Sequence, residues 1–139
     1  MKKLALDVGS KKIGVAVSDS LNLIAQPLMV IRRSSFKQEA EEIRELVAEH
    51  EVNQIVVGLP INMDGSFGPQ AKMATDYAAK LEEALKIDVV KFDERRTTVE
   101  AEKVLIEARV TRKKRKEVID KLAAVKILQT FLMLESKKY

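Results

Sequence analysis

Residues 4–19 read Leu4-Ala5-Leu6-Asp7-Val8-Gly9-Ser10-Lys11-Lys12-Ile13-Gly14-Val15-Ala16-Val17-Ser18-Asp19. Two apolar runs, 4–8 and 13–17, flank turn residues at Gly9-Ser10, and this pattern predicts an antiparallel hairpin. Asp7 is the exception, because a carboxylate inside an apolar run loses hydration unless a cation, backbone donors or a metal ion compensates. Asp7 either caps the turn or belongs to a site, and this stretch alone does not distinguish the two.

The rest of the chain alternates between helical and extended patterns. A third strand is expected at 23–32, where Pro27 indicates a sheet edge or a bulge. Later elements follow from capping boxes, a helix-opening proline and short apolar runs. In order, they are a helix at 35–51, a strand at 54–60, a helix opening at Pro69, a strand at 87–93, a helix from Thr97 to about Arg109, and a final helix covering 118–132.

This order predicts an α/β fold. Strands that alternate with helices pair in parallel through right-handed crossovers. Joined to the opening three-stranded meander, they give a mixed five-stranded sheet in the order 3-2-1-4-5, flanked by helices, with the fourth and fifth strands parallel to the first. The 139 residues, 46% of them hydrophobic, suit a single domain spanning 1–139.

Composition excludes several classes of function. There is no Cys, so disulfides, thiolate catalysis and zinc–thiolate sites are ruled out. The single His, His50, lies in a charged segment where a solvated side chain is the better interpretation than a Ser-His-Asp triad. No apolar run approaches the ~20 residues of a membrane span, and the first residues show no signal-peptide pattern. We expect a cytoplasmic protein.

The net charge of +4 is unevenly spread. Residues 1–94 contain 12 Lys and Arg against 15 Asp and Glu, whereas residues 95–139 contain 13 against 6. The basic last third indicates an anionic partner, although a solvated helix face would look the same. Its most basic run is Arg112-Lys113-Lys114-Arg115-Lys116, which is either a clamp on a nucleic-acid backbone or a charged loop.

Three acids lie where the topology could bring them together. Sites in open α/β sheets form beyond the carboxyl ends of the central strands. Asp7 ends the first strand, Asp93-Glu94 ends the fifth, and Asp120 lies on the packed side of the final helix. Converging carboxylates repel one another unless a cation sits among them, and oxygen ligands without His or Cys select Mg²⁺ or Mn²⁺. The alternative is three unrelated acids: a turn cap, a strand-end acid and a helix-start acid.

Several motifs now make a resemblance visible. The sequence resembles the YqgF/RuvX family of Holliday-junction resolvases and pre-16S rRNA nucleases, in the ribonuclease H-like superfamily. The match covers nearly the whole chain, and Asp-Glu-Arg-x-Thr-Thr is its most specific part. The matching residues are 6–9 and 12–16, 57–60 with 62–66, 93–95 with Thr97-Thr98, and Asp120 with Ala123-Ala124 and Ile127-Leu128.

The resemblance implies a metal-dependent nuclease acting on structured nucleic acid, either a four-way DNA junction or the precursor of small-subunit ribosomal RNA. Asp7, Glu94 and Asp120 match the family's catalytic acids and would hold Mg²⁺ or Mn²⁺. Asp93 is a support or an alternative to Glu94, because strand alternation sends these neighbours to opposite faces.

The cations near these acids are expected to contact phosphates; they are Lys11, Lys12, Arg95 and Arg96. A four-way junction has two-fold symmetry, so symmetric cleavage of it would call for a homodimer.

Two rival functions remain. The actin-like ATPase superfamily shares this core and holds ATP between two such domains, but this chain has the length of only one. A non-catalytic nucleic-acid-binding factor in ribosome assembly would keep the basic residues and need no acid cluster. Comparing Mn²⁺ binding by the parent protein and Asp7→Asn separates this second rival from a nuclease.

Overall fold

The computed structural model describes residues 1–96 and 122–136. In this part of the chain, five strands form one sheet in the order β3-β2-β1-β4-β5, which confirms the predicted order. The strands are β1 (Lys2–Val8), β2 (Lys12–Ser18), β3 (Ala25–Arg32), β4 (Val52–Leu59) and β5 (Asp88–Asp93). The helices are α1 (Phe36–Glu49), α2 (Pro69–Leu85), the short 3₁₀ turn η1 (Glu94–Arg96) and α5 (Leu122–Ser136).

The pairing register places the hairpin at the centre of the sheet. β1 and β2 run antiparallel and pair Asp7 with Gly14, while β1 and β4 run parallel and pair Leu6 with Val57. On the far side of β2, the register shifts just before Ala16 pairs with Pro27. The bulge and the edge position expected at Pro27 are therefore both present, as the missing amide N–H of proline requires.

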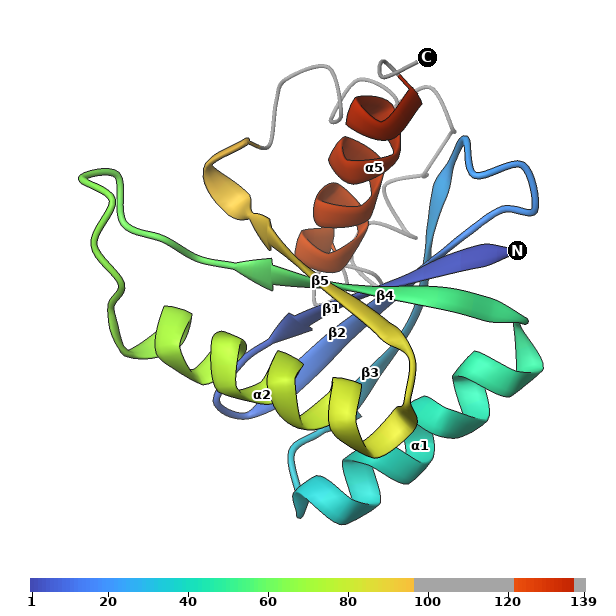
Figure 1. Ribbon diagram of the computed structural model, residues 1–139, viewed down its shortest axis with the longest axis horizontal. Helices are drawn as coiled ribbons and strands as arrows, with labels where there is room; N and C mark the ends of the chain where they lie inside the picture. Colours follow the sequence, from blue (N-terminus) through green and yellow to red (C-terminus); the bar gives the residue numbers. More distant parts are fainter. Residues whose placement is uncertain (97–121, 137–139) are drawn as a thin grey trace, which may run out of the picture.

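The helices cover the sheet from both sides (Figure 1). α1 and α2 lie on one side, and their buried residues join Leu4, Leu6 and Val8 in one core. α5 lies on the other side, where it packs on a second core that includes Ala5 and Val56. Because side chains alternate along a strand, odd-numbered residues of β1 face α5.

Local sequence explains where the helices begin and end. Ser35 caps α1 by accepting a hydrogen bond from the Gln38 N–H at 3.2 Å, as its spacing predicted. Pro69 opens α2, and Lys86 ends it in the left-handed conformation. The first helix ends at Glu49, two residues before its predicted end. The helix predicted from Thr97, the acid Asp120 and the basic run 112–116 lie outside the described residues.

The buried side-chain amide of Gln129 links α5 to the segment that leads into β3. The Gln129 side chain accepts a hydrogen bond from the Ala25 N–H at 2.9 Å and donates one to the Leu23 carbonyl at 3.0 Å. Both bonds join the last described helix to the segment that enters β3. Among the residues described, none of the helices combines the length and apolar composition needed to cross a bilayer.

Candidate active site

Asp7 stands near the end of the central strand, on the face that α5 covers. Its side chain is half-buried. Its neighbours across the sheet are both glycines: Gly14 is its antiparallel partner on β2, and Gly58 lies on β4 one residue beyond the Leu6–Val57 pair. A strip without side chains therefore flanks the carboxylate of Asp7 on both sides.

Glu94 reaches the same strip from the next strand. It follows β5 at the start of η1, two residues after Phe92, which pairs with Gly58. Its Cδ and Oε2 atoms lie 3.2 Å from the position that a Cβ on Gly58 would occupy. Gly58 thus leaves the space that the Glu94 carboxylate fills, beside Asp7.

The pKa shifts of the two acids show that their carboxylates lie close enough to interact. Burial, and after it the negative charges of Asp7 and Asp93, together raise the pKa of Glu94 to about 7. Burial also raises the pKa of Asp7. Two half-buried carboxylates that disfavour each other's charge form a site that a divalent cation would stabilise.

These shifts predict how the stability of the metal-free protein depends on pH. Between about 4.5 and about 7, the folded protein keeps the Glu94 proton that the unfolded chain has lost. The unfolded chain then binds fewer protons, so the free energy of unfolding falls as pH rises through this window and levels off above it. The raised pKa of Asp7 acts in the same direction.

The measurement is the melting temperature in EDTA at pH 5, 6, 7 and 8. Glu94→Gln is expected to flatten the decline, because the glutamine has no proton to lose. Asp88→Asn, at the exposed start of β5, is the matched control and should melt with the parent's pH profile. Parallel declines in the parent and in Glu94→Gln would contradict the assignment.

Asp93 is engaged elsewhere. Its carboxylate accepts from the Arg95 guanidinium at 3.0 Å and 2.7 Å, and from the Arg95 backbone N–H at 2.9 Å. The hydrogen bonds from Arg95 lower the pKa of Asp93. Because the Asp93 carboxylate is already paired with Arg95, Glu94 remains the better candidate of the two for a metal ligand.

The predicted phosphate-binding cations lie in different surroundings. Arg95 is bound to Asp93, and its Nη1 also reaches the Asn62 carbonyl at 3.5 Å, so a phosphate would compete with both. The guanidinium of Arg96 lies over the Phe92 ring, 5.7 Å from its centroid. Lys11 and Lys12 are exposed on the β1–β2 turn, directly after the strand that carries Asp7.

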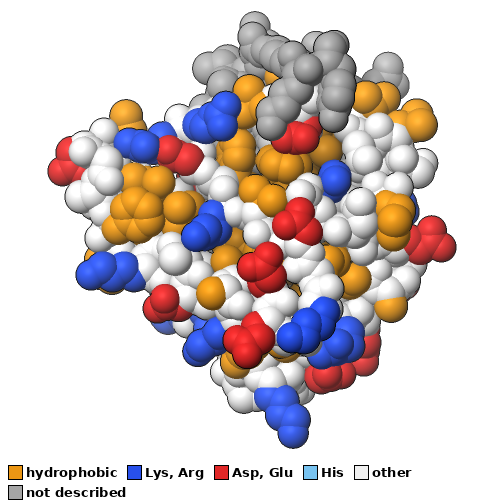
Figure 2. Space-filling view, in the orientation of Figure 1, with side chains coloured by type: hydrophobic (Ala, Val, Ile, Leu, Met, Phe, Trp, Pro, Cys, Tyr) orange, Lys and Arg blue, Asp and Glu red, His pale blue; other side chains and the backbone are white. Residues whose placement is uncertain are grey.

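The loop between β4 and α2 contacts Arg95 and is stabilised by hydrogen bonds among its own residues. Ser66 donates to Asp64 from both its backbone N–H and its hydroxyl, and Asn62 donates to the Ser66 Oγ at 3.0 Å. Met63 and Phe67 remain 88% and 47% exposed. Figure 2 shows hydrophobic side chains gathered on the molecular face over this loop. The loop that contacts Arg95 therefore presents two exposed apolar side chains.

The structure brings together two of the three predicted acids, Asp7 and Glu94. Asp120 lies outside the described residues, and within the described ranges no three Asp, Glu or His side chains form a group that could hold a metal ion. Sequence reasoning missed the role of Gly58. Its signal was a glycine inside a buried strand, which often marks a close approach by another group.

Comparison with known proteins identifies the family. A family model, RuvX, with the description Holliday junction resolvase, matches residues 1–134. The chain belongs to the RuvX family. Several relatives carry the description "Putative pre-16S rRNA nuclease", two of them as follows. The one from Thermoanaerobacter pseudethanolicus is 52% identical and covers 99% of this chain and 100% of its own length. The one from Halalkalibacterium halodurans is 54% identical and covers 95% of this chain and 96% of its own length.

Solved structures show the same fold at much lower identity. Thermus thermophilus RuvC in complex with a Holliday junction substrate matches this RuvX chain with a TM-score of 0.66 and 13% identity, over 99% of this chain and 96% of that one. Thermus thermophilus RuvC in a second structure gives a TM-score of 0.56 at 14% identity, over 99% and 97% of the two chains. The predicted ribonuclease H-like fold is confirmed.

Proposed function

We propose that this chain is a metal-dependent nuclease that hydrolyses phosphodiesters in structured nucleic acid, within one domain spanning 1–139. The observation that carries the proposal is the pair of carboxylates, Asp7 and Glu94, that meet over the glycine strip at the carboxyl end of the central strand. Membership in the RuvX family supports the same function. The absence of Cys from the chain agrees with action in the cytoplasm.

The donor set fits a hard divalent ion. Asp7 and Glu94 offer carboxylate oxygens only, the ligands that Mg²⁺ and Mn²⁺ prefer. We assign both residues to the metal and propose Asp120 as the third ligand. When bound, such an ion supplies charge neutralisation on the phosphate and an acidified water.

The chain's own residues have separate tasks. The backbone of β1 fixes Asp7, so Asp7 would hold the metal with the least movement of its own. The gap at Gly58 lets Glu94 approach, and without a metal Glu94 keeps a proton on its carboxylate up to about pH 7. The cations that flank the three acids in the sequence bind backbone phosphates and orient the substrate strand; in our proposal these are Lys11, Lys12, Arg95, Arg96 and the run Arg112, Lys113, Lys114, Arg115 and Lys116.

Two substrates deserve a direct comparison. The relatives that share half of this sequence are named for precursor 16S rRNA, and the family model is named for the Holliday junction. We propose precursor 16S rRNA as the main substrate, since those relatives match over nearly their full length. A four-way DNA junction is the second candidate, and its two-fold symmetry would call for a homodimer.

The test places both substrates side by side. A synthetic four-way junction and a precursor 16S rRNA fragment are incubated with the protein in Mg²⁺, in Mn²⁺ and in EDTA. Cleavage of the RNA that requires the metal supports the proposal, and cleavage of the junction alone would shift the substrate to DNA. Binding of either substrate without cleavage in any metal would favour a non-catalytic ribosome-assembly factor.

A further inference from the structure

The orientation of the Asp7 carboxylate depends on the position of its own backbone. Within the described part of the chain, no side chain donates a hydrogen bond to it. What fixes it is the end of β1, paired with β2 through Asp7–Gly14 and Val8–Ile13. The turn that follows is closed by a hydrogen bond from the Gly9 N–H to the Lys12 carbonyl at 2.9 Å. Whatever holds this turn also holds Asp7.

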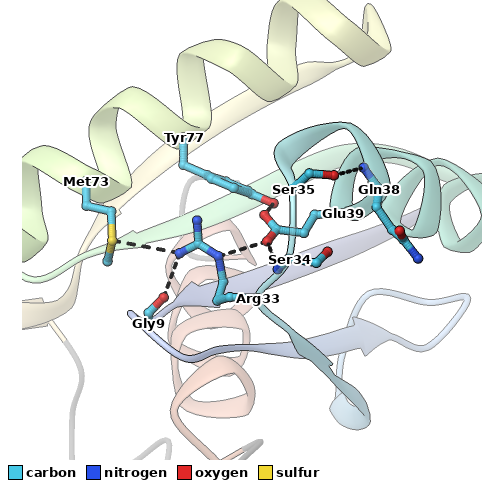
Figure 3. Close-up of polar contacts among 8 residues, drawn as sticks. All are labelled: Gly9, Arg33, Ser34, Ser35, Gln38, Glu39, Met73 and Tyr77. Carbon is cyan, nitrogen blue, oxygen red and sulfur yellow. Dashed lines mark hydrogen bonds and ion pairs between the residues drawn. The ribbon is translucent and has the colours of Figure 1, made fainter.

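Arg33, directly after β3, donates hydrogen bonds to two carbonyls of the turn. Its backbone N–H donates to the Lys11 carbonyl at 3.0 Å, and its Nη1 donates to the Gly9 carbonyl at 2.7 Å. Figure 3 shows the guanidinium extended from β3 towards Gly9. A hydrogen bond from a cation to a carbonyl is about twice as strong as a neutral one. The turn is therefore clamped by a charged group that itself has to be held in place.

A fully buried carboxylate holds that guanidinium. Glu39, on α1, has no exposed surface. Its Oε2 accepts from Arg33 Nε at 3.1 Å and from the Ser34 N–H at 2.7 Å, and its Oε1 accepts from the Tyr77 hydroxyl at 2.9 Å (Figure 3). The Tyr77 ring also lies under the guanidinium, 5.3 Å from centroid to Cζ. Arg33 thus has a single fixed geometry on the side of the sheet opposite α5.

We propose that Arg33 is a positioning residue for the metal site. Held by Glu39, it fixes the β1–β2 turn and so the direction in which Asp7 points on the other face of the sheet. This inference rests on the proposed function, because Asp7 is taken as a metal ligand. A purely structural role for the network would affect stability alone.

Two variants separate positioning from stability. In Arg33→Lys the charge is kept, but a single ammonium group cannot reach Glu39 and Gly9 together as the planar fork does. In Tyr77→Phe the buried Oε1 of Glu39 loses its hydrogen bond, which destabilises the fold, while both Arg33 bonds to the turn stay in place. Tyr77→Phe is therefore the matched control for destabilisation.

The first readout does not need activity. The chain has five glycines, so selective ¹⁵N-glycine labelling gives a simple amide spectrum that includes Gly9. We expect the Gly9 amide of Arg33→Lys to exchange with solvent about tenfold faster than in the parent, since turn opening becomes easier. Gly14 and Gly58 should be unchanged, and Tyr77→Phe should match the parent at Gly9. Unchanged exchange at Gly9 in Arg33→Lys would overturn the proposal.

The second readout is the site itself. Mn²⁺ binding by Arg33→Lys should weaken about tenfold, the lower range for losing a group that supports metal ligands, and kcat should fall at least as much with KM within about twofold. Tyr77→Phe should keep the parent's Mn²⁺ affinity and kcat. Parent protein that binds Mn²⁺ but cleaves nothing would defeat the proposed function and leave the Mn²⁺ comparison to decide this inference. Equal Mn²⁺ affinities in parent and Arg33→Lys, or equal losses in both variants, would overturn it.

Discussion

Asp7→Asn is expected to abolish cleavage while making the protein more stable. Asparagine keeps the volume of the side chain but removes the charge, so the metal loses its central ligand. Activity should fall by well over 100-fold, because losing even an outer-shell partner of a metal site costs about 10–100-fold. The folded state gains, since burial disfavours a charged Asp7 and its charge in turn raises the pKa of Glu94.

The two effects are measured on the same samples. In EDTA at pH 8, the melting temperature of Asp7→Asn should rise by about 2–4 °C, the shift that about 1 kcal/mol produces in a domain of this size. Asp76→Asn, on the exposed side of α2, should change neither quantity. If Asp7→Asn folds and cleaves as the parent does, Asp7 is not a metal ligand.

Gly58→Ala is expected to damage both stability and activity from a position that carries no chemistry. The new Cβ would overlap the Cδ1 of Ile127 on α5 and would lie 3.2 Å from the Glu94 carboxyl atoms. Overpacking of this kind costs about 1–3 kcal/mol. Cleavage should fall about tenfold or more, because displacing a metal ligand by a fraction of an ångström spoils the site.

A double variant tells the two contacts apart. Ile127→Val removes the overlapping methyl, so Gly58→Ala with Ile127→Val should be more stable than the two single losses predict. Its cleavage should stay low, because Glu94 is still displaced. Gly68→Ala is the control, since a Cβ there meets only Asn62 Nδ2 at an ordinary 3.6 Å. Equal behaviour of Gly58→Ala and Gly68→Ala would show that Glu94 needs no such gap.

Patterns of period two and of helical spacing were enough to predict the sheet. The hairpin, the bulge at Pro27 and the cap at Ser35 follow from local backbone chemistry, and the structure contains all three. The pairing of Asp7 with Glu94 was predictable in outline, because parallel strands end at one edge of a sheet. The position of Gly58 between these two acids was not predictable, because it depends on the pairing register of β4 and β5.

Interactions between side chains were harder to foresee. Arg95 was expected on phosphate, but its i, i+2 relation to Asp93 at a strand end lets it fold back onto that carboxylate. Glu39 is a buried acid on an amphipathic helix, and sequence reasoning did not single it out. It does share a stripe with Ile43 and Leu46, one turn and two turns away, and that spacing was a signal of burial. What the sequence lacks is the partner, because Tyr77 comes from another helix.

The hydrogen bond between Ala25 and Gln129 has a consequence for folding during synthesis. Its two ends are 104 residues apart. At about 5–20 residues per second, translation separates the appearance of these two residues by about 5–20 s. Until α5 leaves the ribosome, the second core lacks the residues that α5 contributes, so α5 completes packing begun by the first hairpin.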